Sequence, residues 1–197
     1  MALTVEVISD VICPCCYIGK RRLEKAMTLA GWQDVRVRWH PFQLNPQMPR
    51  EGMSRRAYRT AKFGSWEQSL ALDARVREVG RGEGIRFAFE KQERTPNTLD
   101  AHRLIGLADR QGFQDAVVEA LFRAYFTEGR DIGDRPTLLD VTAQAGLVRR
   151  ISERSVRENC EGDQADSIAA AGMRQAGTGA PADHGGRPTR RRRPGEG

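Results

Sequence analysis

The chain has 197 residues, of which 39% are hydrophobic, and a net charge of +6. This length suits one domain with an insertion, or two small domains. No segment approaches the roughly 18 consecutive apolar residues of a membrane-spanning helix. The N-terminal residues lack a basic stretch followed by a long apolar run, so the sequence predicts a cytoplasmic protein without a secretory signal.

The positive charge is unevenly distributed along the chain. Residues 181–197 carry half of it and include four consecutive arginines, Arg190 to Arg193. Elsewhere, acidic and basic residues are nearly balanced and mixed along the predicted helices, as on solvated helix faces. The arginine run can bind phosphate polymers without sequence preference, but the charge pattern does not predict a specific nucleic-acid interface.

The first part of the chain has the pattern of a βαβ unit. Residues 3–8 alternate between apolar and polar, which predicts a strand. The sequence Cys13-Pro14-Cys15-Cys16 follows, and then a helical pattern that ends near Gly31. A second alternating run covers residues 35–39 and ends at Pro41. A helix between two short strands indicates that the strands are parallel.

From about Arg55 to Ala176 the pattern is mainly helical. Ser65 and Gln68 have the spacing of a helix-capping box. Residues 177–197 contain no large apolar side chain, and this composition predicts disorder because it cannot bury enough apolar area to offset the entropy of ordering. Further helices are predicted over residues 98–110, 114–126, 137–146, 148–160 and 164–176.

Cys13 and Cys16 are the strongest chemical signal in the sequence. Two thiols at this spacing, at the start of a helix, can form a small reversible disulfide. The helix N-terminus supplies unpaired N–H groups and about half a positive charge, which favours a thiolate. We therefore predict redox chemistry in which Cys13 attacks and Cys16 resolves. A zinc site is disfavoured, because structural zinc usually has four ligands and no second cysteine pair is present.

Several segments resemble the FrnE-like branch of the DsbA oxidoreductases. The segment from Ser9 to Arg21 is similar to the active-site segment of that branch, and Trp39 to Pro46 to its second strand and following turn. The resemblance covers residues 3–181. The same superfamily includes 2-hydroxychromene-2-carboxylate isomerases and kappa-class glutathione transferases. Further similar segments are found at residues 97–104, 121–126 and 131–134.

The resemblance implies an α/β, thioredoxin-like fold with a helical insertion domain. Residues 1–50 would form the N-terminal half of the thioredoxin-like unit, and residues 51–176 the insertion domain and a return helix. Residues 177–197 would hold the remnant of a cis-proline loop and a basic tail. Gly179-Ala180-Pro181 resembles that loop, so the resemblance places Pro181 opposite the cysteines, where it would shape the substrate site.

The resemblance fails after Pro181. The family continues there with a β-hairpin and a final helix, which need roughly 25–30 residues. Only 16 residues remain, and almost none is apolar. We therefore predict that the hairpin and helix are missing, through a frameshift or truncation near Gly177, which translation of the other reading frames of the gene would test. The first strand would then have an exposed edge.

Five residues are predicted to contact the substrate: Pro14, Cys15, Asn97, His102 and Pro181. Cys15 is either a thiol on the rim of the site or one that competes in disulfide exchange. His102 lies on an apolar helix face, where a core histidine is usual, but its segment resembles the family's Asn-Thr-x-x-Ala-His-Arg. A fourth cysteine, Cys160, fits a buried helix position better than a resolving role.

The predicted function is thiol–disulfide oxidoreductase activity that oxidises, reduces or isomerises protein disulfides through Cys13 and Cys16. The predicted partners are protein or small-molecule thiols and disulfides, without a membrane, a specific nucleic acid, a metal or an organic cofactor. A homodimer is one option. Two alternatives stay open. One is a glutathione-dependent isomerase or transferase, with glutathione as co-substrate, and the other is an inactive product of a damaged gene.

Overall fold

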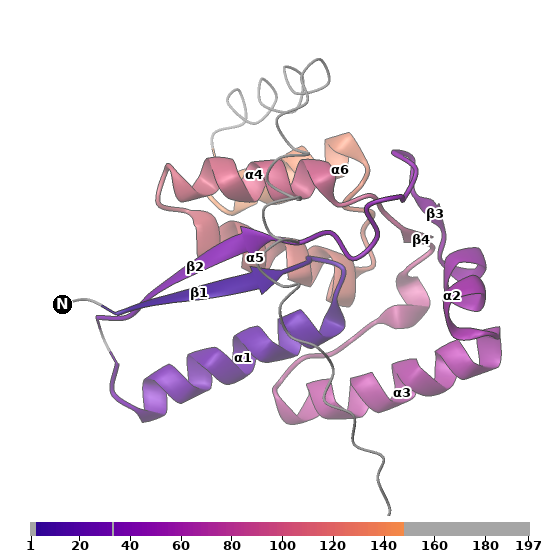
Figure 1. The fold of residues 1–197 in the computed structure, drawn as a ribbon, viewed down its shortest axis with the longest axis horizontal. Coiled ribbons are helices and arrows are strands. Elements are labelled where there is room, and N and C mark those ends of the chain that lie inside the picture. Colours follow the sequence, from indigo (N-terminus) through magenta and orange to yellow (C-terminus); the bar gives the residue numbers. More distant parts are fainter. Residues whose placement is uncertain (1–2, 33, 148–197) are drawn as a thin grey trace, which may run out of the picture.

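The computed structural model describes residues 3–32 and 34–147 (Figure 1). The predicted helices over 148–160 and 164–176 and the segment 177–197, with Cys160 and Pro181, lie outside the described residues. The strands are β1 (Thr4–Ser9), β2 (Arg36–Pro41), β3 (Met53–Ser54) and β4 (Arg94–Thr95). The helices are α1 (Pro14–Leu29), α2 (Arg55–Phe63), α3 (Trp66–Gly82), α4 (Leu99–Asp109), α5 (Gln114–Arg123) and α6 (Arg135–Gln144), with a 3-10 turn η1 (Phe89–Lys91) and a π-helical turn η2 (Ala124–Glu128).

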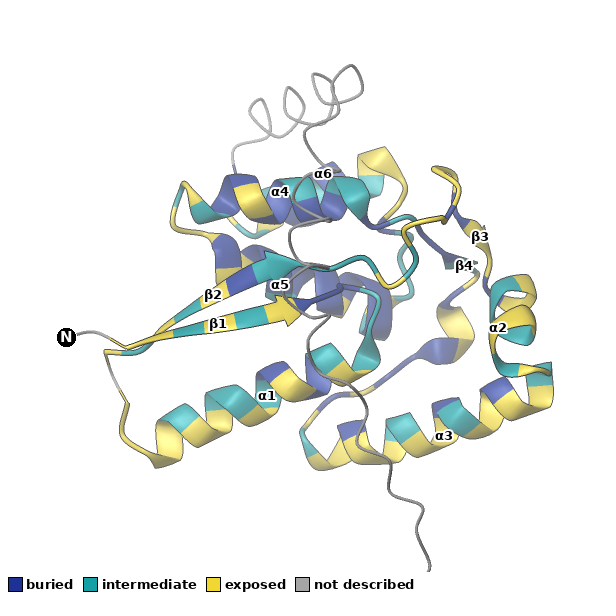
Figure 2. Cartoon of the chain, in the orientation of Figure 1, coloured by how far each residue is buried: buried dark blue, intermediate teal, exposed yellow. Residues whose placement is uncertain are grey.

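The strands β1 and β2 form a parallel pair, in which Ser9 lies opposite Pro41 at the carboxyl ends. Parallel strands need a crossover connection, and α1 supplies it. The apolar–polar alternation that predicted β1 corresponds to an alternation in burial along the strand (Figure 2). Val5 and Val7 are half-buried, whereas Thr4, Glu6 and Ile8 beside them are exposed. The predicted βαβ unit is confirmed.

The residues at the start of α1 are suited to a helix N-terminus. Cys13 is the N-cap, and Pro14 follows at the first helical position, where a missing N–H removes no helix hydrogen bond. The N–H of Cys13 donates to the carbonyl oxygen of Asp10 at 3.0 Å. The helix ends at Leu29, and Gly31 has a φ of 65°, so a glycine follows the helix end as the sequence predicted.

Aromatic packing holds α1 against α5. In Figure 1, α1 lies along one side of the β1–β2 pair and α4 along the other, and both α4 and α5 contact β2. Phe122 on α5 is fully buried, and the ring of Tyr17 on α1 stacks on it with 4.9 Å between centroids. Phe126 in η2 lies 6.2 Å from Phe122 and extends the cluster. The core therefore forms directly behind the first turns of α1.

A second, smaller group of elements lies beside this core. β3 and β4 pair antiparallel, which the sequence did not predict because each strand has only two residues. The Arg55 and Asp73 side chains form a buried ion pair of 2.6 Å between α2 and α3, and Arg59 contacts the same carboxylate at 2.7 Å. The predicted cap of α3 is confirmed, since Oγ of Ser65 accepts a hydrogen bond from the N–H of Gln68 at 3.1 Å.

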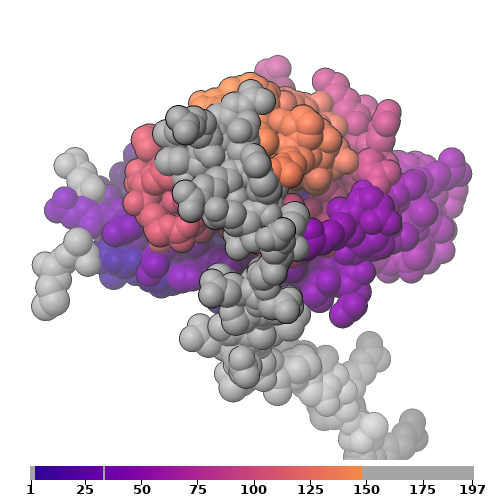
Figure 3. All heavy atoms as spheres, turned by 90° about the horizontal axis from the view of Figure 1, so that it is seen from above, coloured from indigo at the N-terminus to yellow at the C-terminus, as the bar shows by residue number. Residues whose placement is uncertain are grey.

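Two predicted helix boundaries differ from the structure. α6 begins at Arg135, two residues before the predicted start, because the Asp134 side chain caps it by accepting from the N–H of Thr137 at 3.0 Å. The helix predicted over 114–126 is α5 followed by the π-helical turn η2. Seen from above, the orange atoms of α6 lie at the surface (Figure 3).

We expect Phe122→Ala to lower the free energy of unfolding by about 3–5 kcal/mol, because it removes a fully buried ring and leaves a cavity against α1. Leu29→Ala is the matched control, since Leu29 is 80% exposed at the end of α1, and we expect a change within about 0.5 kcal/mol. Urea unfolding followed by circular dichroism measures both. Equal effects of the two substitutions would contradict the packing described.

Candidate active site

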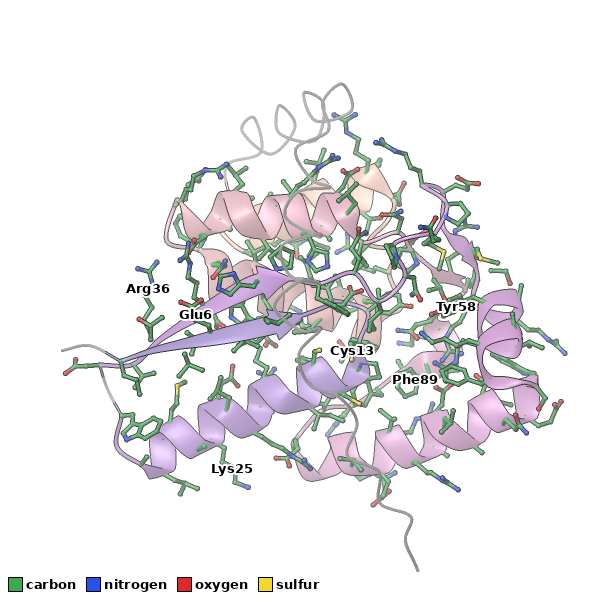
Figure 4. The ribbon with its side chains drawn as sticks, in the orientation of Figure 1. Glu6, Cys13, Lys25, Arg36, Tyr58 and Phe89 are labelled. Atoms are coloured by element: carbon green, nitrogen blue, oxygen red, sulfur yellow. The ribbon has the colours of Figure 1, made fainter. Side chains whose placement is uncertain are left out.

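The cysteine turn lies where β1 ends and α1 begins (Figure 4). Cys13 is the N-cap of α1, and Cys16 lies in its first turn. Both are half-buried, as is Pro14, whereas Cys15 is exposed. Four residues that the sequence predicted for the site are therefore within one helical turn, and Cys15 offers the thiol that is most open to solvent.

The thiols of Cys13 and Cys16 are coupled by a hydrogen bond between their side chains. This bond, assisted by the N–H of Asp10 and the hydroxyl of Ser9, lowers the pKa of Cys16 to about 7. The same bond, with burial, raises the pKa of Cys13 well above its usual range, although the N–H groups of Cys15 and Cys16 act in the opposite direction. Above about pH 7, the pair therefore holds one proton between its two sulfurs.

The helix N-terminus acts on this pair, as the sequence predicted. The hydrogen bond with Cys16 and burial raise the pKa of Cys13, and the N–H groups of Cys16 and Cys15 lower it. Because the two thiols titrate together, the lowered pKa of about 7 belongs to the pair, and Cys13 as the attacking thiol stays a prediction. Partial burial, and then the charge of Cys13, raise the pKa of Cys15, which makes it the weaker nucleophile at neutral pH.

Asp10 fixes the segment that leads into the cysteine turn. Its carboxylate is buried, with 1% of the residue exposed. Oδ1 accepts from the N–H of Ile12 at 3.3 Å, and Oδ2 accepts from the N–H of Leu44 at 2.8 Å. The first contact is an Asx-type turn, and the second joins the start of α1 to the loop after β2. An Asp between a strand and a helix start is a sequence signal for this role, although the role was not among the predictions from the sequence.

His102 on α4 lies against Asp10. It is buried, and its Nε2 is 3.3 Å from Oδ1 of Asp10, without the alignment of a hydrogen bond. Its Nδ1 has no hydrogen-bond partner within the described part of the chain. The structure therefore brings His102 to the back of the cysteine turn, and direct contact with a substrate stays a prediction.

Asn97 lies at the start of α4, where its side chain holds two segments together. Its Nδ2 donates to the carbonyl oxygen of Met48 at 2.7 Å, and its Oδ1 accepts from the N–H of Leu99 at 2.9 Å. Nε2 of Gln43 also lies 3.4 Å from Oδ1. Asn97 thus orders the loop after β2 against α4, and its predicted contact with substrate stays a prediction.

Charged groups anchor α1 one turn beyond Cys16. Lys20 is 3% exposed and bonds to Glu24 and, at 3.0 Å, to Asp115 on α5. Burial by itself lowers the pKa of Lys20, but the hydrogen bond with Glu24 and the charge of Asp115 outweigh it, so the pKa is raised. The buried ammonium is therefore paired with carboxylates on both α1 and α5. Arg21 pairs with Glu119 on α5, and together these contacts hold the cysteine turn on the core.

Two residues considered for the site, Pro181 and Cys160, lie outside the described residues, so the cis-proline loop stays a prediction. Across residues 3–32 and 34–147, no group of three or more His, Cys, Asp or Glu side chains is arranged to hold a metal ion. No helix in those same ranges is long and apolar enough to cross a membrane.

Residues 4–184 match the profile of the DSBA-like thioredoxin domain. The chain belongs to this family. Its α/β, thioredoxin-like fold and its kinship with the DsbA-like oxidoreductases were both predicted from the sequence and are confirmed. The assignment to the FrnE-like branch stays a prediction.

Three proteins show the range of the relationship. A probable DsbA oxidoreductase from Streptomyces coelicolor is 29% identical, with a TM-score of 0.79, over 91% of this chain and 78% of that one. The cytosolic disulfide reductase DsbM from Pseudomonas aeruginosa is 23% identical, with a TM-score of 0.63, over 88% and 78% of the two chains. The uncharacterised protein YwbO from Bacillus subtilis is 26% identical over 75% of this chain and 68% of its own.

A 2-hydroxychromene-2-carboxylate isomerase also shares the fold. It is 17% identical, with a TM-score of 0.64, over 88% of this chain and 81% of that one. Membership of the family therefore supports an enzyme with oxidoreductase relatives, and the isomerase shows that the same fold carries a second type of chemistry.

We expect iodoacetamide to alkylate the Cys13–Cys16 pair with a half-maximal rate near the pKa of about 7 that the shared hydrogen bond gives Cys16. The rate rises with pH because the thiolate is the reactive form. Cys15 in the same protein is the internal control and should react at higher pH, since its pKa is raised. Peptide mass spectrometry separates the sites. A midpoint for the pair at or above about 8.5, as for a free thiol, would contradict the coupling.

Proposed function

We propose that the protein is a thiol–disulfide oxidoreductase that uses Cys13 and Cys16 as a redox-active dithiol. The observation that carries the proposal is the position of the two thiols at the start of α1, where Cys13 is the N-cap and the N–H of Cys16 donates to the carbonyl oxygen of Cys13 at 3.1 Å. Their interaction lowers the pKa of one thiol of the pair to about 7. A thiol with a pKa near ambient pH is close to the optimum for disulfide exchange. Family membership supports the same reaction class.

Cys13 is the proposed attacking thiol, and the shared proton allows this. When the proton moves from Cys13 to Cys16, the negative charge moves to Cys13, where the N–H groups of Cys15 and Cys16 donate to its sulfur. The Asp10 carboxylate opposes negative charge on Cys16 and so favours the transfer. Cys13 is also the N-cap residue, the position where the helix presents its unpaired N–H groups.

The exchange has two steps. The Cys13 thiolate attacks one sulfur of a substrate disulfide, forms a mixed disulfide, and releases the other substrate sulfur as a thiolate, which takes up the proton that Cys16 then loses. The Cys16 thiolate then attacks the Cys13 sulfur, forms the Cys13–Cys16 disulfide, and releases the second substrate thiolate. Two electrons pass from the protein to the substrate, and the reverse sequence oxidises a substrate dithiol.

Protein or small-molecule thiols and disulfides are the proposed partners. The Pseudomonas reductase, described as cytosolic, has also been solved with glutathione, in a structure that shares a TM-score of 0.60 with this chain. That neighbour supports glutathione as one thiol partner and a cytoplasmic setting. It is less than 25% identical, so the support comes from the shared fold and from the dithiol of this chain.

The decisive experiment compares the two cysteines as serine variants with a peptide disulfide. We expect Cys16→Ser to accumulate a mixed disulfide between Cys13 and the peptide, because no thiol remains in position to resolve it, and to lose at least about 99% of turnover. Cys13→Ser should form no mixed disulfide at the active site. Reductase assay and intact-protein mass spectrometry measure the two effects.

A second variant separates this function from its alternatives. Cys15→Ser keeps the Cys13–Cys16 pair and should still release the mixed disulfide; trapping in this variant would make Cys15 the resolving thiol. Full activity of Cys16→Ser with glutathione and a non-disulfide substrate would contradict the dithiol mechanism and favour an isomerase or transferase. No reaction of wild-type protein with any disulfide would support an inactive product.

A further inference from the structure

The outer edge of β2 is closed to a further strand. The N–H of Trp39 donates to Oε1 of Gln114 at 2.9 Å, and Nε2 of Gln114 donates to the carbonyl oxygen of Trp39, also at 2.9 Å. The buried Gln114 side chain thus binds both main-chain groups that a neighbouring strand would use. Pro41, two residues further along β2, has no N–H to offer. Both features prevent strand addition at this edge.

The outer edge of β1 is open in the part of the chain that the structure describes. The N–H of Arg36 donates to the carbonyl oxygen of Leu3 at 2.9 Å, so the odd-numbered residues of β1 direct their main-chain groups toward β2. The even-numbered residues Thr4, Glu6 and Ile8 direct theirs away from it, because these groups alternate between the two edges of a strand. Within residues 3–32 and 34–147, no strand pairs with this outer edge.

Apolar side chains lie exposed along the open edge. Leu3 is 52% exposed and Ile8 is 46% exposed. The only charged side chain of β1 is Glu6, which contacts His40 of the neighbouring strand β2 (Figure 4). An edge with free main-chain groups, exposed apolar residues and little charge is a template for pairing with another strand.

The sequence beyond residue 147 does not predict such a strand. Residues 148–160 and 164–176 have helical spacing, and residues 177–197 contain no large apolar side chain. A strand that continues this sheet over the core needs apolar residues at every second position. The segment β1 itself has that pattern, so a second copy of the chain can supply the missing neighbour.

We propose that the outer edge of β1 pairs with the same edge of a second copy of this chain. The two chains then share a four-stranded sheet in the order β2–β1–β1–β2, around a two-fold axis perpendicular to the sheet. The two β1 strands are antiparallel, because that axis reverses the direction of a strand. The cysteine turns follow the carboxyl ends of these strands and lie at opposite ends of the shared sheet. This inference does not depend on the dithiol function proposed above.

The side chains of β1 select the register of this pairing. An axis at Glu6 would place two carboxylates directly opposite each other, which is destabilising. An axis at Val7 would place an apolar side chain opposite Glu6. An axis at Val5 places Val5 opposite its copy and Leu3 opposite Val7 on one face, and Thr4 opposite Glu6 on the other. We therefore place the axis at Val5, where apolar side chains meet on the face that covers the core.

The test is sedimentation velocity of the full chain over a range of concentrations, in a reducing buffer that prevents a disulfide through the exposed Cys15. We expect wild-type protein to dimerise. Thr4→Glu should raise the dissociation constant between about twofold and thirtyfold, because it places two like-charged pairs across the axis, each with Glu6 of the other copy. Thr4→Lys should lower the constant by a similar factor. Gln47→Glu and Gln47→Lys, at an exposed position after β2, are the matched controls and should keep the wild-type value.

A wild-type protein that is monomeric at every concentration overturns the inference. A dimer whose dissociation constant is the same in the Thr4 and Gln47 variants also overturns it, because the interface then lies elsewhere. Should a Thr4 variant fail to fold, amide hydrogen exchange of wild-type protein replaces it. We expect the protection of the N–H of Glu6 to increase with protein concentration. Protection that is independent of concentration means that the same chain covers the edge, and it overturns the inference.

Discussion

The buried carboxylate of Asp10 is the contact on which the geometry of the site depends. Its two oxygens accept hydrogen bonds from the main-chain N–H groups of Ile12, before α1, and Leu44, after β2. Its own carbonyl oxygen accepts from the N–H of Cys13. These bonds set the direction in which the chain leaves β1 and enters α1. Because the cysteines occupy the first turn of that helix, the same bonds determine where both sulfurs lie.

The rest of the described structure supports this junction from two sides. Tyr17 stacks on Phe122, and Lys20 is held by Glu24 and Asp115, so the first two turns of α1 are fixed to the core. On the other side, Asn97 ties the loop after β2 to α4. A rigid backbone matters here because a dithiol exchanges its bond at a defined distance between sulfurs. The first turn of α1 fixes the two cysteines relative to each other, since the N–H of Cys16 donates to the carbonyl oxygen of Cys13 at 3.1 Å.

Much of this arrangement could be predicted from the sequence, because the signals are local. The alternation in residues 3–8, the Pro after Cys13 and the glycine at position 31 each act within a few residues, and β1, α1 and β2 form as expected. The Ser65 cap is another local signal that the structure confirms. The resemblance to a known family then supplied the fold that these elements belong to.

Contacts between distant residues could not be predicted in the same way. β3 and β4 are too short to have a pattern, and each exists only because the other pairs with it. Asp10 and His102 are far apart in the chain, and neither residue type indicates which side chain it will contact in the fold. The pKa of the thiol pair has a predictable and an unpredictable part, since the helix N-terminus is a local effect whereas the interaction between the sulfurs depends on their side-chain geometry.

The most direct measurement of the central claim is the disulfide connectivity of the chain across a series of glutathione redox buffers. Peptide mapping by mass spectrometry, after acid quenching and alkylation, identifies every cysteine that is oxidised at each potential. The account predicts one reversible intramolecular disulfide between Cys13 and Cys16, with Cys15 remaining a free thiol. A disulfide that instead involves Cys15, or a chain in which Cys13 and Cys16 never pair, would contradict it.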